Sequence, residues 1–464
     1  MKNNAMRMLI ALLSALLLAN GALAANRYVR TGAAGNGSGT DWVNAYTQLP
    51  SSLVRGDTYF IADGNYGSYT FGDQPSGGTL ITIRKATPAS HGTDVGWQDS
   101  YGDGEALFTG SDTVWSFKPG VGYYDISGTT GSAGVSRSYG IRLYSTSSRN
   151  SAAALVMADT SGTYSQTGNN DTITLDRIDF DWNNGTSAGS SGATRAVQWN
   201  ASNPSRNIKL SNCYLHHSSG FAVYAAGVGS NLIVDNCFVE RNGGATSSHH
   251  ETFWVTGTNG FRLSNSTIKD TLPGALTGWV MLGDVSNALI YNNVFTCSNV
   301  STCSTGGNGI IATWDANQYA NSNVGIYNNT FANLPTSGNP SIYFYHSGGA
   351  ADSNVNVQNN IFFTGAFSVV GAATNGYAAC GGGVSCPGTN SQTNLGTSIF
   401  LSWAAQDFRL AVATSPGIAT QFSLDKLGTT RASDGSWDRG AFEFGGTAGA
   451  PVGPPSPPVN LVVR

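Results

Sequence analysis

The sequence predicts an all-β fold in which short strands wind into a parallel β-helix, a single-stranded β-solenoid. Three observations predict it. Glycine accounts for 60 of 464 residues and only 11% of residues are charged, which is typical of a turn-rich β protein that dissolves through neutral polar groups. One six-residue pattern recurs about every 30 residues. An export signal precedes the repeats and a Gly/Pro-rich tail follows them, so the repeats fill most of the mature chain.

Residues 1–25 have the features of a secretory signal peptide. Lys2 and Arg7 make the start basic, and an apolar run over 8–19 leads to small residues ahead of Ala25. The run is too short to span a bilayer comfortably, so we expect a secreted, extracellular or periplasmic protein without membrane insertion. The formal net charge of −4 becomes −6 when Lys2 and Arg7 leave with the signal, and no Lys/Arg run occurs. This balance argues against nucleic acid as a partner.

Residues 26–75 are expected to form an N-terminal cap. An open solenoid exposes sheet edges that pair with other chains unless something covers them. Thr40 precedes DWVNAYTQL, which has the pattern of a short capped amphipathic helix. Its apolar positions are Trp42, Ala45, Tyr46 and Leu49. The sequence therefore predicts a helical cap at this end.

The coils, expected over about 76–400, carry a hexapeptide that begins and ends with an apolar residue. It occurs as LDRIDF (175–180), LSNCYL (210–215), VDNCFV (234–239), LSNSTI (263–268), IYNNVF (290–295), IYNNTF (326–331) and VQNNIF (357–362). A unit of about 30 residues cannot bury its own apolar face, so successive units must stack with strands ~4.8 Å apart. The pattern predicts one coil per hexapeptide.

The third position of the hexapeptide is Asn in six of the seven copies. Asn tolerates the left-handed φ of a tight bend, and its amide can bond the same amide one coil away. We therefore expect an internal Asn ladder. The intervals between copies vary from 24 to 36 residues, so the insertions should form loops between strands, where function is usually carried.

The NNxF turns, the opening RYVRTGAAGNGSGTDWVNAY and the closing TTRASDGSWDRGAFEF resemble segments of the right-handed parallel β-helix (pectate-lyase-like) superfamily of secreted bacterial proteins. The resemblance runs from about Asn26 to Phe444. It implies one right-handed β-helix domain over 26–445 with a C-terminal cap over 401–445, while 446–464 has the composition of a linker. This scaffold carries lyases, hydrolases, epimerases and binding proteins, so the resemblance implies a fold rather than a reaction.

Six cysteines fall into three predicted disulfide pairs. Their spacing does not match a zinc site, and an exported protein meets an oxidising compartment. Cys297 with Cys303 and Cys380 with Cys386 each enclose five residues, and Cys213 with Cys237 is the remaining pair.

The third strand of each coil is expected to line a glycan-binding groove. Side chains alternate faces along a strand, which places Tyr224, Trp254 and Tyr343 outward, together with Met281 and Ile311. Stacking aligns them into an aromatic strip on which sugar rings can pack. The alternative is that loops cover the strip and these residues are ordinary packing.

Ionisable residues gather beside this strip. Equivalent positions in three adjacent coils are His216, Glu240 and Lys269, and one residue later His217, Arg241 and Asp270. The loop of the middle coil adds His249, His250 and Glu251. Titratable groups crowded in a cleft are candidate catalytic residues, whereas an ion-pair network that only pins loops is the competing interpretation.

Enzymes that the chain resembles mostly cleave acidic polysaccharides by β-elimination or neutral ones by hydrolysis, and we favour a polysaccharide lyase-like enzyme acting on a uronate-containing glycan. Elimination needs the uronate carboxylate neutralised and a base for the adjacent carbon-bound proton. We expect Arg241 to neutralise, and Lys269 or His250 to act as base, with His249 and Glu251 beside them.

Substrate contacts are expected from Trp254, Tyr224, Tyr343, His216 and His217. Ca²⁺ is the expected cofactor, because Glu240, Glu251 and Asp270 could offer it oxygen ligands. A glycoside hydrolase, which needs two carboxylates astride the bond, and a non-catalytic glycan-binding or structural protein remain alternatives. We expect a monomer whose partner is a polysaccharide.

Overall fold

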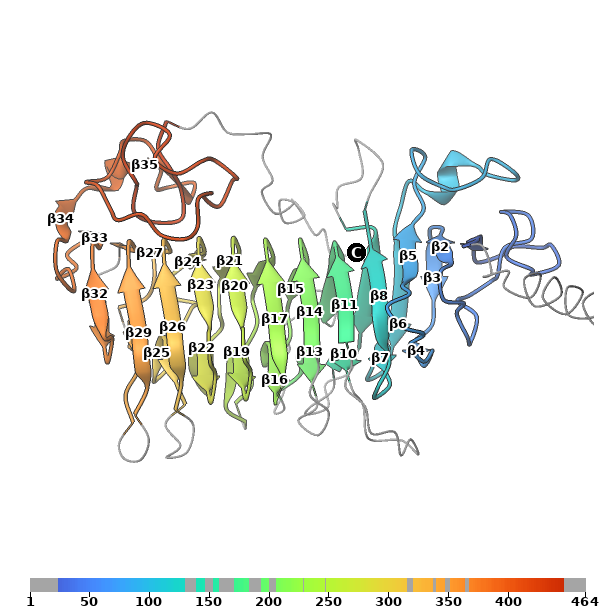
Figure 1. Cartoon of the computed structure of the whole chain (residues 1–464), viewed down its shortest axis with the longest axis horizontal. Helices are drawn as coiled ribbons and strands as arrows, with labels where there is room; N and C mark the ends of the chain where they lie inside the picture. Colours follow the sequence, from blue (N-terminus) through green and yellow to red (C-terminus); the bar gives the residue numbers. More distant parts are fainter. Residues whose placement is uncertain are drawn as a thin grey trace, which may run out of the picture.

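The computed structural model describes residues 24–129, 139–146, 153–157, 171–182, 193–199, 206–227, 229–246, 248–314, 320–336, 339–346, 351–363 and 367–445. Three long parallel sheets, here A, B and C, run the length of the molecule (Figure 1). Each coil contributes one strand to A, then one to B and one to C, which makes a parallel β-helix whose crossovers follow the right-handed rule. The predicted fold class is confirmed.

Sheet A holds the strand that begins each hexapeptide. Its strands are β1 (Asn26–Val29), β2 (Thr58–Ile61), β5 (Ile81–Lys85), β8 (Gly122–Ser127), β11 (Asp171–Asp176), β14 (Arg206–Ser211), β17 (Ser230–Asp235), β20 (Arg262–Ser264), β23 (Leu289–Tyr291), β26 (Ser322–Tyr327), β29 (Ser353–Gln358) and β32 (Thr374–Gly376).

Sheet B follows after the Asn bend. Its strands are β3 (Gly64–Tyr66), β6 (Ala106–Gly110), β9 (Ile141–Ser145), β12 (Ile178–Trp182), β15 (Tyr214–His216), β18 (Phe238–Glu240), β21 (Thr267–Lys269), β24 (Val294–Thr296), β27 (Thr330–Ala332), β30 (Ile361–Phe363), β33 (Ala379–Gly381) and β34 (Gln392–Leu395).

Sheet C closes each coil. Its strands are β4 (Tyr69–Phe71), β7 (Trp115–Phe117), β10 (Ala153–Met157), β13 (Arg195–Trp199), β16 (Phe221–Ala226), β19 (His250–Thr256), β22 (Leu276–Gly283), β25 (Gly309–Thr313), β28 (Ser341–Tyr343) and β31 (Ser368–Val370). Outside the sheets lie the short 3-10 helices η1 (Asp99–Tyr101) and η3 (Thr397–Ile399) and the antiparallel pair β35 (Phe400–Ser402) and β36 (Asp407–Leu410).

The core fills the centre of the coil with the apolar ends of the hexapeptides. First positions such as Leu210 and Val234 point inward from sheet A, and sixth positions such as Phe331 and Phe362 point inward from sheet B; all are at most 1% exposed. Rings at equivalent positions stack, with 5.3 Å between the centroids of Phe331 and Phe362. The repeat therefore sets the coil, as the sequence predicted.

The bend between sheets A and B has left-handed backbone at the third hexapeptide position in all seven copies, with φ between 51° and 57°. A second, fully buried ladder lies one residue later than the predicted one. Asn293, Asn329 and Asn360 are at most 1% exposed, and the Oδ1 atom of each accepts the backbone N–H of the equivalent residue one coil before, as in the 2.9 Å contact of Asn329 Oδ1 with Asn293 N. Third-position amides bond one another across coils as predicted, such as Asn236 to Asn212 at 2.7 Å. Asn292, Asn328 and Asn359 are buried, and each also bonds the C-terminal segment.

The predicted Cys213–Cys237 disulfide is wrong, because both residues are free thiols. They occupy the position of the buried ladder: the backbone N–H of Cys213 points at Cys237 Sγ at 3.4 Å, and the N–H of Cys237 donates to Ser266 Oγ at 3.0 Å. Both thiols also contact backbone carbonyls, that of Cys213 at Ser211 O. The other two pairs, Cys297–Cys303 and Cys380–Cys386, are disulfides as predicted.

The N-terminal segment does not form the predicted helix. Residues 40–49 run through bends, and Tyr46 makes a parallel bridge with Val29 at the edge of sheet A. Tyr46 donates its N–H to Tyr28 O at 2.8 Å and accepts from Arg30 N at 2.8 Å, so its backbone extends the sheet instead of closing helical turns. Trp42 is still fully buried, as its place in the apolar pattern required.

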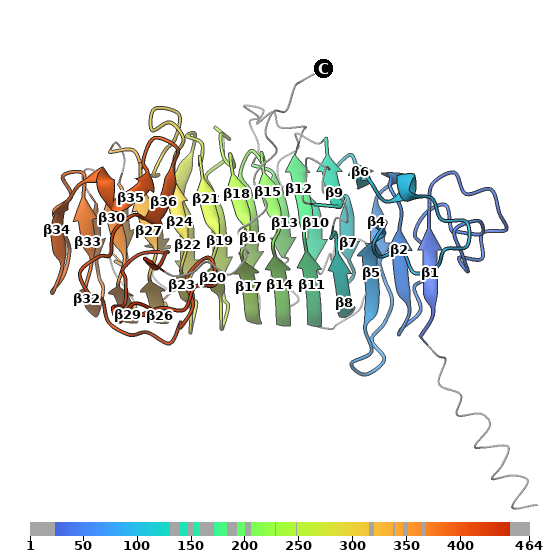
Figure 2. The same ribbon diagram turned by 90° about the horizontal axis from the view of Figure 1, so that it is seen from above.

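The C-terminal segment, residues 396–445, lies along the outer face of sheet B over β24 to β33, as Figures 1 and 2 show in red. Phe400, Phe408 and Phe442 pack there on outward residues such as Val294 and Ile361. The segment reaches back to β18 and β21, whose residues Phe238 and Lys269 line a pocket together with Arg409 and Lys426 of the segment.

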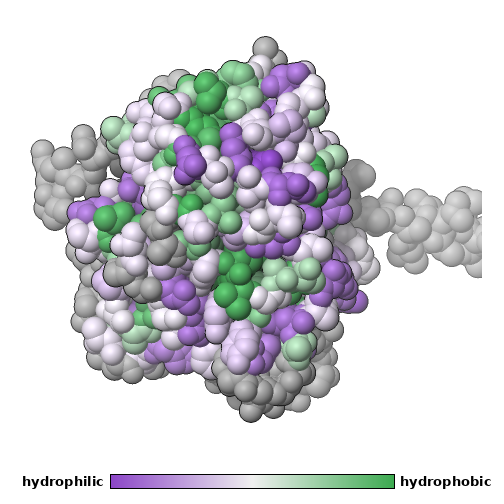
Figure 3. Space-filling model, turned by 90° about the vertical axis from the view of Figure 1, so that its left-hand side faces the viewer, coloured by the Kyte–Doolittle hydropathy of each residue, from purple (hydrophilic) through white to green (hydrophobic). Residues whose placement is uncertain are grey.

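The last coil ends the stack at the left of Figure 1. Seen from that side, hydrophobic patches lie among hydrophilic residues (Figure 3), and side chains such as Val370 are 36% exposed. Within the described residues, no helix is long and apolar enough to cross a membrane.

Candidate functional site

An aromatic strip lies on the outer face of sheet C. Tyr224 of β16 is in register with Trp254 of β19, and their rings stack with centroids 6.4 Å apart. Trp314, directly after β25, packs edge-on against Trp254 at 4.8 Å. All three rings are partly exposed. The structure thus brings together Tyr224 and Trp254, both predicted from sequence, and adds Trp314.

His249 sits against this strip and is held by a buried carboxylate. Its ring lies 5.5 Å from that of Trp314 and 5.9 Å from that of Trp254. Its Nδ1 atom is 3.2 Å from Glu251 Oε1, and the hydroxyl of Thr277 donates to the same oxygen. The side chain of His249 is 55% exposed, whereas that of Glu251 is fully buried. One ring nitrogen is therefore fixed by Glu251 while the other edge of the imidazole meets solvent.

The hydrogen bond with Glu251 raises the pKa of His249, and the charge of the carboxylate adds to this effect against partial burial. The geometry depends on an irregularity of sheet C. The pairing of β19 with β22 shifts by one residue after His250. His250 pairs with Leu276 and Glu251 with Gly278, so Thr277 is an extra residue in β22. This bulge places the Thr277 hydroxyl on the carboxylate.

Arg195 of β13 extends the strip by one coil. Its guanidinium lies over the ring of Tyr224, 4.0 Å from the centroid, and donates to Gln198 Oε1 at 2.9 Å. Sequence reasoning missed this residue. Aligning RAVQW (195–199) with FAVYA (221–225) would have identified this strand, because Val197 is in register with Val223.

The strip is less continuous beyond Trp254 than predicted. Ile311 pairs with Val280 and points inward, so Ala312 takes the outward position. Met281 is outward but fully buried. Tyr343 follows Ala312 in register, is partly exposed and lies 5.9 Å from Tyr345.

His250 lies inside the turn between sheets B and C. It is fully buried, its Nε2 accepts the N–H of Gly244 at 3.3 Å, and its Nδ1 is 3.4 Å from Ser248 O. Burial lowers its pKa. Both ring nitrogens are thus bonded to backbone, which leaves no lone pair for a substrate proton.

The predicted charged column exists, but on the outer face of sheet B rather than beside the aromatic strip. His216 pairs with Glu240, and Glu240 pairs with Lys269, across β15, β18 and β21. Lys269 lines a pocket of about 460 Å³ between sheet B and the C-terminal segment, with Arg409 and Phe442 on the other wall. The turn between sheets B and C separates this column from the strip.

The same face continues into a buried cluster that sequence reasoning only half found. His216 Nε2 is 2.7 Å from Asp179 Oδ1, and His216 Nδ1 is 2.6 Å from His217 Nδ1. Asp181 is 3.7 Å from His216 and forms an ion pair with Arg142. Extending the column one coil back from His216 gives Asp181, and alternation in IDFDW puts Asp179 beside it.

The two histidines of this cluster differ in pKa. Burial would lower the pKa of His216, but Asp179 and Asp181 outweigh it and the pKa is raised. Burial lowers the pKa of His217 to about 3, and the charges of His216 and Arg241 add to the effect. His217 and Arg241 occupy left-handed bends, with φ of 60° and 53°.

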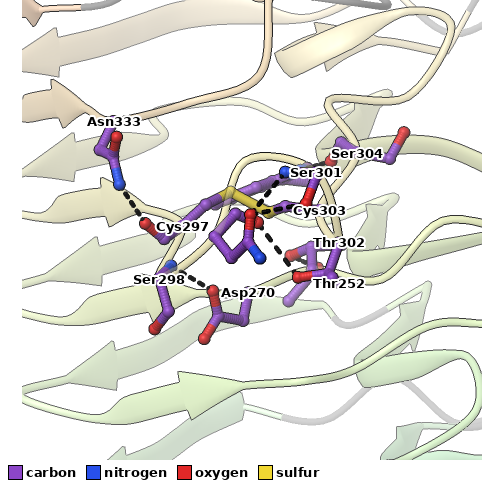
Figure 4. The surroundings of a disulfide bond; sticks show 12 residues. Thr252, Asp270, Cys297, Ser298, Ser301, Thr302, Cys303, Ser304 and Asn333 are labelled. Carbon is purple, nitrogen blue, oxygen red and sulfur yellow. Dashed lines mark hydrogen bonds between the residues drawn. A yellow bond between two sulfur atoms is a disulfide. The ribbon is translucent and has the colours of Figure 1, made fainter.

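The carboxylates expected to hold Ca²⁺ do not fit such a site. Glu240 Oε1 accepts the hydroxyl of Tyr214, Glu251 is bound to His249, and Asp270 Oδ1 accepts the N–H of Ser298 beside the disulfide (Figure 4). Within the described residues, metal-ligand atoms converge in two groups, and neither contains two of these three carboxylates. One group joins Asp270 to Cys297 and Cys303, whose sulfurs are bonded to each other.

No protein-family model matches this chain, and no curated protein sequence does. Among solved structures it is similar to a pectate lyase, Pel9A, with 13% sequence identity over 91% of this chain and 97% of that chain and a TM-score of 0.49. The fold assignment rests on the three parallel sheets themselves.

Proposed function

We propose that the protein is a polysaccharide lyase-like enzyme that cleaves a uronate-containing glycan by β-elimination along the aromatic strip of sheet C. The observation that carries the proposal is His249, exposed between Trp254 and Trp314 and held by the buried carboxylate of Glu251. An oriented imidazole on an aromatic surface is suited to take a proton from a bound sugar. The aromatic cluster lies outside the core, and exposed clusters of this kind usually bind a partner; a glycan is such a partner.

The chain supplies two groups that β-elimination requires. Neutral His249 takes the proton from the carbon next to the uronate carboxylate; the electron pair left there forms the new double bond as the glycosidic C–O bond breaks. The resulting imidazolium is stabilised by Glu251 and can return its proton to the leaving oxygen. Arg195, fixed over Tyr224, is the cation that neutralises a uronate carboxylate on the strip.

Hydrolysis is supported less well. It needs two carboxyl groups on either side of the bond. Among the described residues that contact the strip, Glu251 is a carboxylate, and it is fully buried and bound to His249. We also propose that the enzyme works outside the cytoplasm, because its first 25 residues are typical of an export signal and it carries two disulfides.

The test is to incubate the purified protein with a panel of uronate-containing polysaccharides and to record the ultraviolet absorbance of the unsaturated product. We expect the rate to fall at least ~10²-fold in His249→Ala, since a positioned base contributes this much. His91→Ala is the matched control, because His91 also stacks on a tryptophan (Trp97, 4.3 Å) and bonds a carboxylate (Asp94, 2.9 Å). It lies in the N-terminal part of the chain and should change the rate by less than about twofold.

Three outcomes separate the candidate functions. Unsaturated product that disappears in His249→Ala supports the lyase. Reducing ends released from neutral glycans without unsaturated product would identify a hydrolase. Binding to a glycan without either product would identify a non-catalytic glycan-binding protein.

A further inference from the structure

The buried cluster on sheet B brings three metal-ligand atoms together. Ligand atoms of Asp181, His216 and His217 lie within 4.8 Å of one another. All three residues are at most 9% exposed. Two come from neighbouring strands, β12 and β15, and the third is the first residue of the following turn.

The side chains around these atoms hold them in a metal-binding arrangement. His216 Nε2 is 2.7 Å from Asp179 Oδ1, so His216 donates that N–H and its Nδ1 lone pair faces the cluster. A carboxylate on the far nitrogen of a histidine is the usual partner of metal-bound imidazole. Arg142 binds Asp181 Oδ2, and this leaves Asp181 Oδ1, a buried atom without a hydrogen-bond partner, on the side of His216.

We propose that Asp181, His216 and His217 form a binding site for a divalent transition metal ion such as Zn²⁺. Two imidazoles and one carboxylate match the ligands of Zn²⁺ and its neighbours, whereas Ca²⁺ takes oxygen ligands. The two Nδ1 atoms are 2.6 Å apart. An ion bound at ~2.1 Å to both would hold them ~3.4 Å apart, and small rotations of the two rings provide that separation.

The ion would join adjacent coils of sheet B, because Asp181 belongs to one coil and the two histidines to the next. Three protein ligands leave a fourth position of a tetrahedral ion for water or another ligand. The site does not depend on the proposed lyase activity, since it lies on a different sheet from His249. The competing explanation of the short Nδ1 to Nδ1 contact is a proton shared by the two rings.

The experiment is to titrate the full chain, without a histidine tag and after treatment with a chelator, with Co²⁺. Four-coordinate Co²⁺ absorbs visible light, so the spectrum reports both occupancy and geometry. We expect saturation at one equivalent, displacement by Zn²⁺ and no displacement by Ca²⁺. A rise in the melting temperature with added Zn²⁺ is expected as well, because an ion that binds only the folded chain stabilises it.

His217→Asn removes one ligand with little risk to the fold. Asn333 occupies the equivalent turn position four coils further on, with φ of 53° against 60° for His217. This variant should lose the one-equivalent Co²⁺ signal. Asp179→Asn, which touches the metal only through His216, should weaken binding by ~10- to 100-fold. His91→Asn is the matched control and should bind as wild type does.

Two results would overturn the site. One is wild-type protein that takes up neither Co²⁺ nor Zn²⁺ at one equivalent, which would leave the shared proton as the explanation of the contact. The other is His217→Asn that binds with wild-type affinity, which would place the ion elsewhere.

Discussion

The buried Asn ladder should make a large contribution to stability, and Asn329 is its central residue. Its Oδ1 accepts from Asn293 N at 2.9 Å and from Asn293 Nδ2 at 3.0 Å, while its Nδ2 donates to Ile290 O at 2.9 Å and to Asn360 Oδ1 at 3.1 Å. Asn329→Ala removes all four bonds. At about 1 kcal/mol for each buried hydrogen bond, the free energy of unfolding should fall by about 4 kcal/mol.

The measurement is urea unfolding followed by tryptophan fluorescence. Asn329→Ser gives an internal comparison, because Ser266 occupies the same ladder and accepts the N–H of Cys237 at 3.0 Å. One restored acceptor should recover about 1 kcal/mol. A loss of less than about 1 kcal/mol in Asn329→Ala would show that the ladder bonds contribute little to holding the coils together.

Asn323→Gly is the control; Asn323 lies near the start of β26, in an exposed row of asparagines with Asn287 and Asn354 of the neighbouring coils. Asn323 also makes two amide contacts with neighbouring coils, to Asn287 at 3.1 Å and from Asn354 at 2.8 Å, but it is exposed and has φ of 54°. Water can replace those contacts and glycine adopts that φ without strain, so the loss should stay below about 1 kcal/mol. An equal loss at Asn323 and Asn329 would contradict the importance of burial.

Three further predictions follow from the same structure. Unreduced protein in denaturant should show two reactive thiols, Cys213 and Cys237. The folded protein should show close to none, because both thiols are buried. Six or zero thiols in denaturant would refute the assignment of two disulfides and two free cysteines. Glu251→Gln should move the acidic limb of the pH–rate profile to lower pH, because neutral His249 is the base and Glu251 raises the pKa of His249. An unmoved limb would show that the contact between His249 and Glu251 does not affect the rate. Burial lowers the pKa of Lys426 to about 7, so the unfolded chain binds more protons than the folded chain above that pH, and stability should rise from pH 7 towards 10. Lys426→Met should flatten this rise in pH-dependent thermal unfolding, and an unchanged slope would assign it to another group.

The hexapeptide was enough to predict sheets A and B, because burial of its first and sixth residues is a property of each coil alone. The sequence predicted the third-position ladder but not the fourth-position one, since Asn suits both the bend and the interior, and only packing shows which amides fill the interior. The sequence also predicts a disulfide between Cys213 and Cys237, because nothing in their spacing shows that they fill ladder positions, where the N–H of Cys213 points at Cys237 Sγ.

The candidate site was less accessible from sequence. Tyr224 and Trp254 followed from alternation, and His249 with Glu251 from their crowding, but the bulge that joins them is a local backbone irregularity with no sequence pattern. Arg195 was missed because its strand was not aligned with the others. The register of the charged column was predicted correctly, but the column lies on sheet B and not beside the strip on sheet C. Stacking determines which residues are neighbours along the helix axis. It does not determine on which face of the coil they lie.

The C-terminal segment that covers β24 to β33 also limits how the molecule can vary in length. Gln406 bonds Cys297 O at 2.5 Å, and Gly440 bonds Asn359 O at 2.7 Å, so one continuous stretch of chain touches successive coils at fixed intervals. Inserting or deleting a coil under it would pull every later contact out of place. Among the described residues, hydrogen bonds from this segment reach back to Asn265, just before β21, which Lys426 contacts. A coil added or removed nearer the N-terminus would leave these contacts in place.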